Sequence, residues 1–190
     1  ISFCMGTKIE RENMKKKVLL GMSGGVDSSV SAIILQEQGY EVIGVTLNLF
    51  SCASCCSYID VKSVCNTLGI PHFIIEGKDV FQKYVINDFI NCYKKCTTPN
   101  PCIECNKYMK FGLMYEKAKE LGCNKIALGH HYDDVIETIL MGMLYGAQVQ
   151  TMMPKLHSTN FEGMELIRPM YLIREDDIKH WRDYNGLHFI

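Results

Sequence analysis

The chain has 190 residues, which is enough for one domain of ordinary size with a sheet covered on both faces. Hydrophobic residues make up 47% and charged residues 22%, values that argue against disorder, collagen and coiled coil. The net charge of −1 leaves any nucleic-acid contact to a local basic patch. No apolar run approaches the roughly 20 residues that span a bilayer, so we expect a cytoplasmic protein with no membrane contact.

Short apolar runs alternate along the chain with segments of helical periodicity. The expected strands lie at residues 17–22, 42–47, 72–75, 125–128 and 166–170. The expected helices lie at residues 26–38, 58–68, 79–92, 103–121, 133–144 and 175–184. Several of these helices stop at a glycine, which is typical of a helix C-terminus. The alternation predicts the α/β class with a doubly wound parallel sheet.

The two ends of the sequence look arbitrary. The chain starts at Ile1, offers Met5 and Met14 as candidate starts, and ends at Ile190 in a pattern typical of the opening of another strand. We expect residues 1–13 to be an N-terminal extension, either untranslated or disordered. Residues 14–190 are then expected to be one domain that is truncated at its C-terminus.

A glycine turn, residues 21–29, joins the first expected strand to the first expected helix. Such a turn directs several backbone N–H groups and the positive end of a helix dipole at one point, and glycines let a phosphate approach closely. The turn is neither a Walker A loop nor a dinucleotide-binding Gly-x-Gly-x-x-Gly, which disfavours ordinary phosphoryl transfer and hydride transfer. It predicts an oxyanion site, with a tight structural turn as the alternative.

The run Ser23-Gly24-Gly25-Val26-Asp27-Ser28 resembles the pyrophosphate loop (PP-loop) of the N-type ATP pyrophosphatases, which split ATP between its α and β phosphates to adenylate a substrate. The resemblance implies a Rossmann-like adenine nucleotide alpha hydrolase domain. Asp27 would act in catalysis and help to place Mg²⁺, an ion that prefers oxygen ligands. The residues implied to bind ATP here are Gly21, Met22, Ser23, Gly24, Gly25, Val26, Asp27 and Ser28.

A second motif, the cysteine turn (residues 98–107), contains a Cys-x-x-Cys pair. Asn100 is expected at a helix N-cap and Pro101 at the first helical position. Cys102 and Cys105 would then share one face of the first helical turn, where the helix dipole favours the thiolate form. Two such thiolates can chelate a metal, hold a cluster or carry a persulfide. Two inert buried cysteines are the alternative.

Residues 14–117, including Cys55-Cys56-Ser57, Gly69-Ile70-Pro71-His72 and the cysteine turn, resemble the N-terminal part of the bacterial tRNA-specific 2-thiouridylases of the MnmA type. Residues 121–190, including Leu128-Gly129-His130-His131, resemble the tRNA 2-thiocytidine synthetases of the TtcA type. Both families install sulfur at C2 of a pyrimidine in the anticodon region, after ATP adenylates the C2 oxygen. The resemblance therefore implies an ATP-dependent tRNA sulfurtransferase that forms 2-thiouridine or 2-thiocytidine.

The resemblance also implies individual roles. Cys102 matches the reactive cysteine of the thiouridylases, and Cys102 with Cys105 matches the iron–sulfur ligands of the thiocytidine enzymes. Leu47 and Gly129 match adenosine contacts, although a methionine is usual at the first position. The implied cofactors are ATP, Mg²⁺ and a [4Fe–4S] cluster. The implied partners are tRNA and a sulfur donor, which is a cysteine desulfurase, a relay protein or sulfide, and a homodimer is left open.

One departure from both families concerns a further cysteine that they need downstream, because this chain has none after Cys123. A cubane cluster takes three or four thiolates, so either the missing residue lies beyond Ile190 or the chain cannot thiolate. A zinc site shared by Cys52, Cys55 and Cys56 with the cysteine turn is disfavoured by a gap of about 46 residues. A PP-loop ligase such as a lysidine synthetase, which would not need the cysteine pair, stays open, as does a non-catalytic metal- or cluster-binding fragment.

Two further groups have candidate roles. Asp133 and Asp134 follow the fourth expected strand, at the edge where α/β sheets bind ligands, so they are candidate Mg²⁺ ligands, with helix capping as the alternative. Four lysines bracket the cysteine turn and are candidate contacts of the tRNA backbone, with a solvated basic face as the alternative; they are Lys94, Lys95, Lys107 and Lys110. The helically spaced Tyr108, Phe111, Tyr115 and Ala118 are expected in the core rather than stacked on bases.

Overall fold

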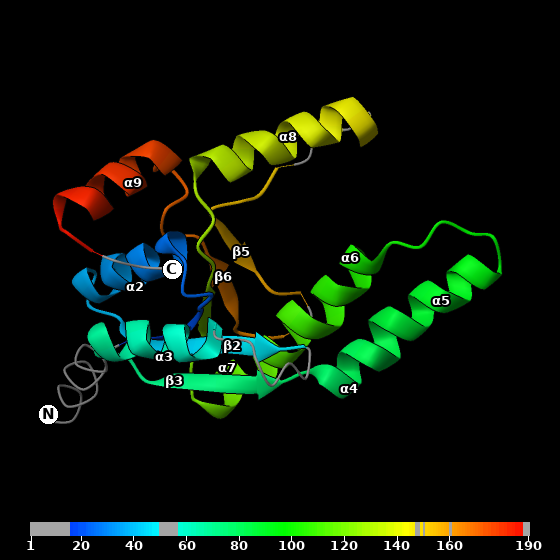
Figure 1. Ribbon diagram of the computed structural model, residues 1–190, viewed down its shortest axis with the longest axis horizontal. Coiled ribbons are helices and arrows are strands. Elements are labelled where there is room, and N and C mark those ends of the chain that lie inside the picture. Colours follow the sequence, from blue (N-terminus) through cyan, green and yellow to red (C-terminus); the bar gives the residue numbers. More distant parts are fainter. Residues whose placement is uncertain (1–15, 50–56, 147–148, 150, 160, 188–190) are drawn as a thin grey trace, which may run out of the picture.

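The structure is a computed structural model that describes residues 16–49, 57–146, 149, 151–159 and 161–187 (Figure 1). Within these ranges the side chains of residues 57–59, Cys102 and Lys110 are left out of the description. The expected N-terminal extension and the cysteines at 52, 55 and 56 lie outside the described residues.

The described residues form a six-stranded sheet in the order β3-β2-β1-β4-β6-β5. Its strands are β1 (Lys17–Gly21), β2 (Glu41–Asn48), β3 (His72–Glu76), β4 (Lys125–Ala127), β5 (Lys155–His157) and β6 (Glu165–Ile167). Neighbouring strands are parallel, except that β5 pairs antiparallel with β6. In the register of the central strand, Leu20 lies beside Gly44 of β2 and Ala127 of β4. The predicted doubly wound parallel sheet is confirmed, with an antiparallel edge added.

The edge formed by β5 and β6 differs from the expected strands for local reasons. The sequence does not predict β5, because its three residues contain a single apolar side chain, which is too short a pattern to indicate a strand. Strand β6 ends at Ile167 rather than at residue 170, since Pro169 has no N–H to donate to a ladder. Met170 still forms an isolated bridge with His131.

Helices cover both faces of the sheet, because alternate residues of each buried strand point to opposite sides. Val18 and Leu20 of β1 belong to a core shared with α2 (Val26–Glu37) and α3 (Ser57–Thr67). Leu19, between them, belongs to the core on the other face, where α7 (Met114–Glu120) packs. Helices α2 and α7 end before Gly39 and Gly122, whose φ angles of +82° and +71° are the left-handed conformation that glycine adopts readily.

A helical arm, residues 78–113, projects past the ends of β2 and β3 (Figure 1). Its first limb comprises α4 (Lys78–Phe81), η1 (Gln82–Ile86) and α5 (Asn87–Lys94), and its second comprises α6 (Pro101–Glu104) and η2 (Cys105–Leu113). The expected helices 79–92 and 103–121 therefore each contain a π-helical segment, η1 or η2. Tyr84 and Tyr108 stack between the limbs, with ring centroids 4.0 Å apart and an interplanar angle of 16°.

The remaining helices lie over the carboxyl end of β4. Helix α8 (Tyr132–Gly146) follows that strand, and α9 (Glu175–Tyr184) lies alongside α2 (Figure 1). Val30 of α2, Met170 and Ile178 of α9 form the buried contact between these two helices. Across the described ranges, the helices are too short or too polar to cross a membrane.

Candidate functional site

The glycine turn between β1 and α2 is held together by its own serines. Gly24 has a φ of +85°, a conformation that L side chains rarely adopt. Ser28 Oγ donates to the Gly25 carbonyl at 3.0 Å and lies 3.3 Å from Ser23 Oγ. Ser29 Oγ donates to the same carbonyl at 2.8 Å. The turn therefore has a defined shape before any ligand binds.

The amino end of α2 is open to a ligand. Its N-cap is Gly25, and no described side chain caps the helix. The first N–H groups of a helix have no partner within it, so those of α2 can bind an oxyanion together with the exposed Ser23. This open helix end agrees with the oxyanion site that the sequence predicts.

The position of the turn in the sheet also favours a ligand. The order β3-β2-β1-β4 makes the junction of β1 with β4 a topological switch point, where open α/β sheets bind ligands. Gly129, just after β4, lies against the start of α2, since a Cβ built on it would be 3.2 Å from both the Asp27 carbonyl carbon and the Ser28 nitrogen. Gly129, one of the two predicted adenosine contacts, is thus beside the turn. Leu47, the second predicted adenosine contact, is half-buried and packs against the core on the α7 face.

Two residues to which the sequence assigns no role, Thr46 and His72, support the turn from β2 and β3. Met22 N donates to the Val45 carbonyl at 2.8 Å, and Thr46 Oγ1 donates to the Met22 carbonyl at 2.7 Å. His72 Nε2 lies 2.8 Å from Thr46 Oγ1, and burial, aided by the charge of Lys62, lowers the pKa of His72. Thr46 stands in no motif, and the run Gly69-Ile70-Pro71-His72 contains His72 without indicating its partner.

Charged groups from α8 and α9 surround Asp27. Partial burial raises the pKa of the Asp27 carboxyl, and the nearby carboxylates of Asp134 and Glu175 raise it further. His131 and Lys179 act in the opposite direction. A cation beside Asp27 would offset the carboxylate repulsion, which is the electrostatic setting that Mg²⁺ binding requires.

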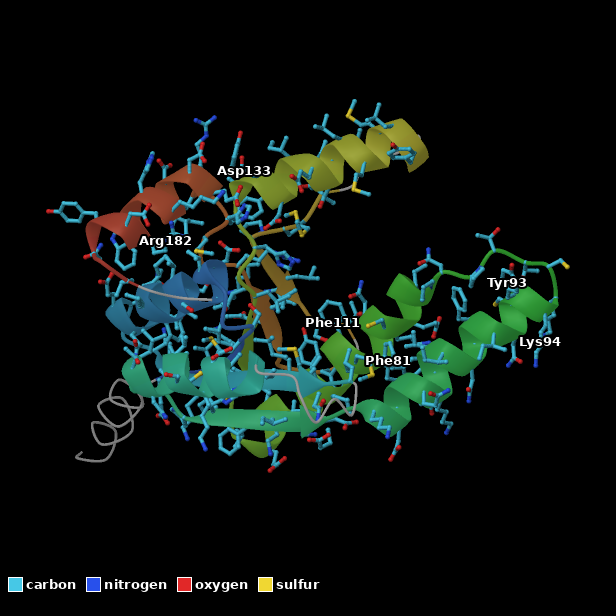
Figure 2. The ribbon with its side chains drawn as sticks, viewed as in Figure 1. Phe81, Tyr93, Lys94, Phe111, Asp133 and Arg182 are labelled. Atoms are coloured by element: carbon cyan, nitrogen blue, oxygen red, sulfur yellow. The ribbon has the colours of Figure 1, made fainter. Side chains whose placement is uncertain are left out.

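Asp133 and Asp134 cap helices, which was the alternative to a metal role. Asp134 Oδ2 accepts a hydrogen bond of 2.9 Å from His131 N at the start of α8. Asp133 Oδ2 accepts one of 2.8 Å from Glu175 N, so it joins the start of α8 to the start of α9 (Figure 2). Their role as Mg²⁺ ligands stays a prediction.

The predicted metal ligands do not form a complete site within the described part of the chain. No group of three or more His, Cys, Asp or Glu side chains in it is arranged to hold a metal ion. Mg²⁺ commonly uses one or two carboxylates together with substrate phosphates, so Asp27 fits that ion. A cluster needs at least three thiolates, and the described residues do not make such a site, so the ligand roles of Cys102 and Cys105 stay predictions.

The cysteine turn forms the start of the second limb of the arm. Helix α6 begins at Pro101, and Ile103 N donates to the Asn100 carbonyl at 3.2 Å, as the expected helix start requires. Cys105 is half-buried and is the first residue of η2. Elsewhere, burial raises the pKa of the Cys65 thiol to about 11, which leaves that thiol protonated and unreactive.

The arm carries the candidate RNA contacts. Lys94 and Lys95 are exposed near its tip, beside Tyr93, whose side chain is 75% exposed (Figure 2). The helically spaced residues expected in the core have different surroundings. Tyr115 of α7 is buried in the core as expected, whereas Tyr108 of η2 stacks on Tyr84. The other members of that set are Ala118, which is buried, and Phe111, which is half-buried.

Comparisons with known proteins identify the family of the chain. The sequence model of the tRNA methyl transferase HUP domain family matches residues 16–151, a range that contains both the glycine turn and the cysteine turn and extends beyond residue 117. The tRNA-specific 2-thiouridylase MnmA of Acetivibrio thermocellus is 49% identical over 136 residues, covering 63% of this chain and 38% of that protein. The enzyme of the same name from Clostridioides difficile is 46% identical over 128 residues, covering 62% and 36%. The chain thus spans well under half the length of these relatives.

Two solved structures share the fold. The U34-tRNA thiolase NcsA from Methanococcus maripaludis, solved with its [4Fe–4S] cluster, has a TM-score of 0.68 at 24% identity, over 95% of this chain and 60% of its own. The NH3-dependent NAD synthetase from Campylobacter jejuni has a TM-score of 0.59 at 16% identity, over 95% of this chain and 69% of its own. At these identities the likeness concerns the fold alone.

Proposed function

Because the chain belongs to the tRNA methyl transferase HUP domain family, we propose that it is the ATP-binding part of an enzyme that thiolates a pyrimidine of tRNA at C2. The observation that carries the proposal is the open amino end of α2 at the switch point of the sheet, with Gly129 packed against it. The relatives that match this part of the chain are named 2-thiouridylases, which supports uridine as the base.

The glycine turn would bind ATP through its phosphates. The N–H groups at the start of α2 and the exposed Ser23 hydroxyl would hold the β and γ phosphates, which leave as pyrophosphate. Asp27 would position Mg²⁺, whose charge offsets that of the phosphates. The adenylyl group is transferred to the C2 oxygen of the pyrimidine. Sulfur then bonds to C2, and the C2–O bond breaks as AMP leaves with the oxygen.

The cysteine turn would deliver the sulfur. Cys105 is half-buried near the start of a continuous helical limb that begins at Pro101, three residues after Cys102. One of Cys102 and Cys105 would accept the outer sulfur of a persulfide from a cysteine desulfurase or a relay protein, whose own thiol is released. After that sulfur bonds to C2, the thiol of the other cysteine would attack the S–S bond, which frees the thiolated base and leaves a disulfide between Cys102 and Cys105. Sulfide, the alternative donor, would instead bond directly to C2 as AMP leaves. A [4Fe–4S] cluster, when bound, would supply an iron that holds the sulfur, and it would need thiolates beyond those in the described residues.

The helical arm would contact tRNA. Residues 78–113 contain six lysines and three acidic residues, whereas the whole chain has a net charge of −1. A local positive charge on an otherwise acidic protein attracts the phosphate backbone. Exposed Lys94, Lys95 and Lys107 would make these contacts.

The test is ATP–pyrophosphate exchange by the purified chain under anaerobic conditions, with and without tRNA. We expect exchange that requires tRNA and that Asp27→Ala abolishes, while Glu162→Ala, which removes an exposed carboxylate outside both the arm and the glycine turn, leaves it unchanged. Exchange that persists in Asp27→Ala would contradict the assigned role. Full activity of Cys105→Ser would indicate a ligase of the lysidine synthetase type, and nucleoside analysis of the product separates 2-thiouridine from 2-thiocytidine.

A further inference from the structure

Two consecutive hydrogen bonds connect β3 to the glycine turn. His72 Nε2 lies 2.8 Å from Thr46 Oγ1, and Thr46 Oγ1 donates to the Met22 carbonyl at 2.7 Å. Met22 is buried, and its N–H donates to the Val45 carbonyl at 2.8 Å. His72, at the start of β3, is thus linked through β2 to the residue that directly follows β1 and begins the turn toward α2.

The direction of these two bonds follows from the number of protons. Thr46 has one hydroxyl proton, which it donates to the Met22 carbonyl. Thr46 Oγ1 must therefore accept from His72, which requires the tautomer of His72 that carries its proton on Nε2. Burial, aided by the charge of Lys62, lowers the pKa of His72, so the ring is neutral at pH 7 and has this one donor. With the proton on Nδ1 instead, the Thr46 hydroxyl would turn to Nε2 and leave the Met22 carbonyl without its donor.

The Met22 carbonyl sets the direction of the next N–H group along the chain. The C=O and N–H bonds of a trans peptide point in opposite directions, and the described residues contain no cis peptide bond. Since Thr46 holds the carbonyl toward β2, Ser23 N–H points away from β2 and approaches Ser28 Oγ at 3.4 Å. Ser28 lies in the first turn of α2, so Ser23 N–H faces the open amino end of that helix.

The N–H groups on this side of the turn have only long contacts. Ser23 N lies 3.4 Å from Ser28 Oγ, and Gly25 N donates to Ser23 Oγ at 3.3 Å. Both distances exceed the usual range of about 2.7–3.2 Å for an N–H···O bond. A phosphate oxygen can replace either hydroxyl at a shorter distance and with a full negative charge. These donors are therefore available to phosphate as long as the peptide between Met22 and Ser23 keeps its direction.

A reversal of this peptide would change the sign of the charge that it presents to the phosphates. The Met22 carbonyl oxygen would then lie where Ser23 N–H lies now, and its partial negative charge would repel phosphate. The Thr46 hydroxyl opposes the reversal through the hydrogen bond that it donates to this carbonyl. His72 in turn keeps the hydroxyl proton directed at the carbonyl.

We propose that Thr46 and His72 are positioning residues for the phosphates of ATP, because together they hold Ser23 N–H toward the β and γ phosphates. The inference rests on the proposed function, and it adds two residues outside the glycine turn on which phosphate binding depends. Their effect passes through one backbone carbonyl, that of Met22. Removal of the Thr46 hydroxyl should therefore weaken binding of the β and γ phosphates and spare a ligand that lacks them.

The experiment measures the Kd of the purified chain for pyrophosphate, ATP and AMP, each with Mg²⁺, by isothermal titration calorimetry. Thr46→Val keeps the shape of the side chain and removes its hydroxyl, so it should weaken binding of pyrophosphate and ATP about tenfold and leave AMP binding unchanged. Thr46→Ser, which retains the hydroxyl, should bind like the wild type. His72→Leu should weaken binding of pyrophosphate and ATP about threefold, and His72→Gln, whose amide N–H can replace Nε2–H, should recover most of that loss.

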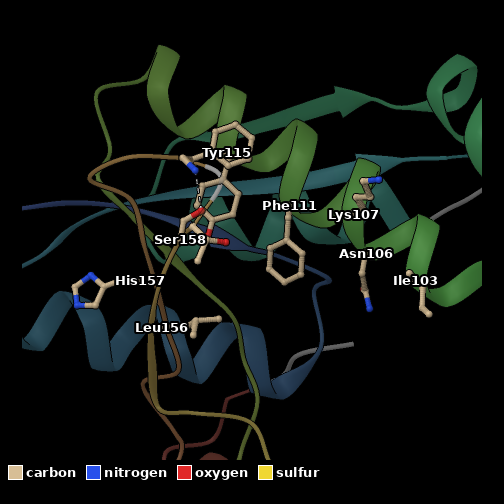
Figure 3. A pocket seen from close by; sticks show the side chains of 10 residues that line it. Ile103, Asn106, Lys107, Phe111, Tyr115, Leu156, His157 and Ser158 are labelled. Carbon is tan, nitrogen blue, oxygen red and sulfur yellow. Dashed lines mark hydrogen bonds between the residues drawn. The ribbon is translucent and has the colours of Figure 1, made fainter.

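Two controls repeat these chemical changes outside the chain of hydrogen bonds. Thr67→Val on α3 also removes a hydroxyl that donates to a backbone carbonyl, that of Ser63 at 3.0 Å. His157→Leu replaces a histidine of β5, at the opposite edge of the sheet, in the wall of a pocket that contains no residue of the glycine turn (Figure 3). Both variants should bind all three ligands like the wild type. Thermal unfolding establishes that each variant is folded, and proton–nitrogen NMR of the histidine rings should show the His72 proton on Nε2.

The outcomes separate this inference from the proposed function. Unchanged affinity of Thr46→Val for pyrophosphate, an equal loss of affinity for AMP, or no recovery in Thr46→Ser would overturn the positioning role. A His72 proton on Nδ1 would overturn it as well. A wild-type chain that binds neither ATP nor pyrophosphate would contradict the proposed function itself, whereas normal binding by the wild type together with insensitive variants removes the positioning role alone.

Discussion

The glycine turn and the helical arm place candidate functional groups by different means. The turn is built from backbone: its shape comes from Gly24, from serines bonded to the Gly25 carbonyl and from the approach of Gly129. The arm depends on side chains, with its two limbs joined by the stack of Tyr84 on Tyr108 and its lysines exposed to solvent. Substitutions in the turn should therefore change the free energy of unfolding and the affinity for ATP. Substitutions on the arm should change the affinity for tRNA.

The largest effect is expected for Gly129→Ala. The added Cβ would lie 3.2 Å from backbone atoms of Asp27 and Ser28, and backbone cannot move aside as a flexible side chain can. We expect the free energy of unfolding to fall by about 1–3 kcal/mol, with weaker ATP binding because α2 shifts away from β4. Urea unfolding and calorimetric titration with ATP measure the two effects.

The control for that substitution is Gly146→Ala at the end of α8, where a new Cβ would meet no atom within 4 Å. It should leave both stability and ATP affinity close to those of the wild type. Wild-type behaviour of Gly129→Ala would show that the contact between β4 and α2 is not what shapes the turn.

The second prediction concerns Glu165 and acid. Hydrogen bonds from Lys125 first, and then from Lys155, lower the pKa of Glu165 from 4.5 to about 2. Because the pKa in the folded state lies below that in the unfolded state, this carboxylate stabilises the fold fully above pH 4.5, and the contribution is lost as the pH falls toward about 2. The ion pairs of Glu165 on β6 with Lys125 on β4 and Lys155 on β5 connect these three strands, so they stabilise the sheet rather than the arm.

Glu165→Gln tests this assignment. At neutral pH this substitution should reduce the free energy of unfolding by about 1 kcal/mol. The difference in the free energy of unfolding between the variant and the wild type should shrink as the pH falls below 4.5. Glu162→Gln, in the exposed loop just before β6, is the matched control and should follow the wild-type curve. A pH profile of Glu165→Gln parallel to that of the wild type would contradict the assignment.

The sequence predicts the local structure of the glycine turn, a strand followed by a turn and a helix, better than that of the arm, for a physical reason. A turn that needs Gly24 at positive φ and an open helix start has few possible sequences, so its pattern is specific. The alternation of strand and helix likewise follows from periodicity, and Pro101 marks the start of α6 as expected.

The sequence could not predict features that depend on distant contacts. The π-helical segments η1 and η2 face each other through Tyr84 and Tyr108, a pairing that no local pattern encodes. Strand β5 is held by pairing with β6 and by the Lys155–Glu165 ion pair rather than by its own residues. Asp133 accepts a hydrogen bond from the start of α9, 42 positions along the chain, and only the structure shows this capping contact.

The smallest expected effect belongs to the arm and requires salt to detect it. Each phosphate contact adds about 0.7–0.9 to the slope of log Kd against log salt concentration, because binding releases a condensed counterion. Replacing both Lys94 and Lys95 with alanine should therefore lower the slope for tRNA by about 1.4–1.8 if both bind phosphate, with stability and ATP binding unchanged, since both side chains are exposed. Lys62→Ala on α3, also exposed, should leave the slope as it is. An unaltered slope in the double variant would show that Lys94 and Lys95 are solvated and do not contact phosphate. Of the lysines proposed above, Lys107 would then remain as the contact to RNA.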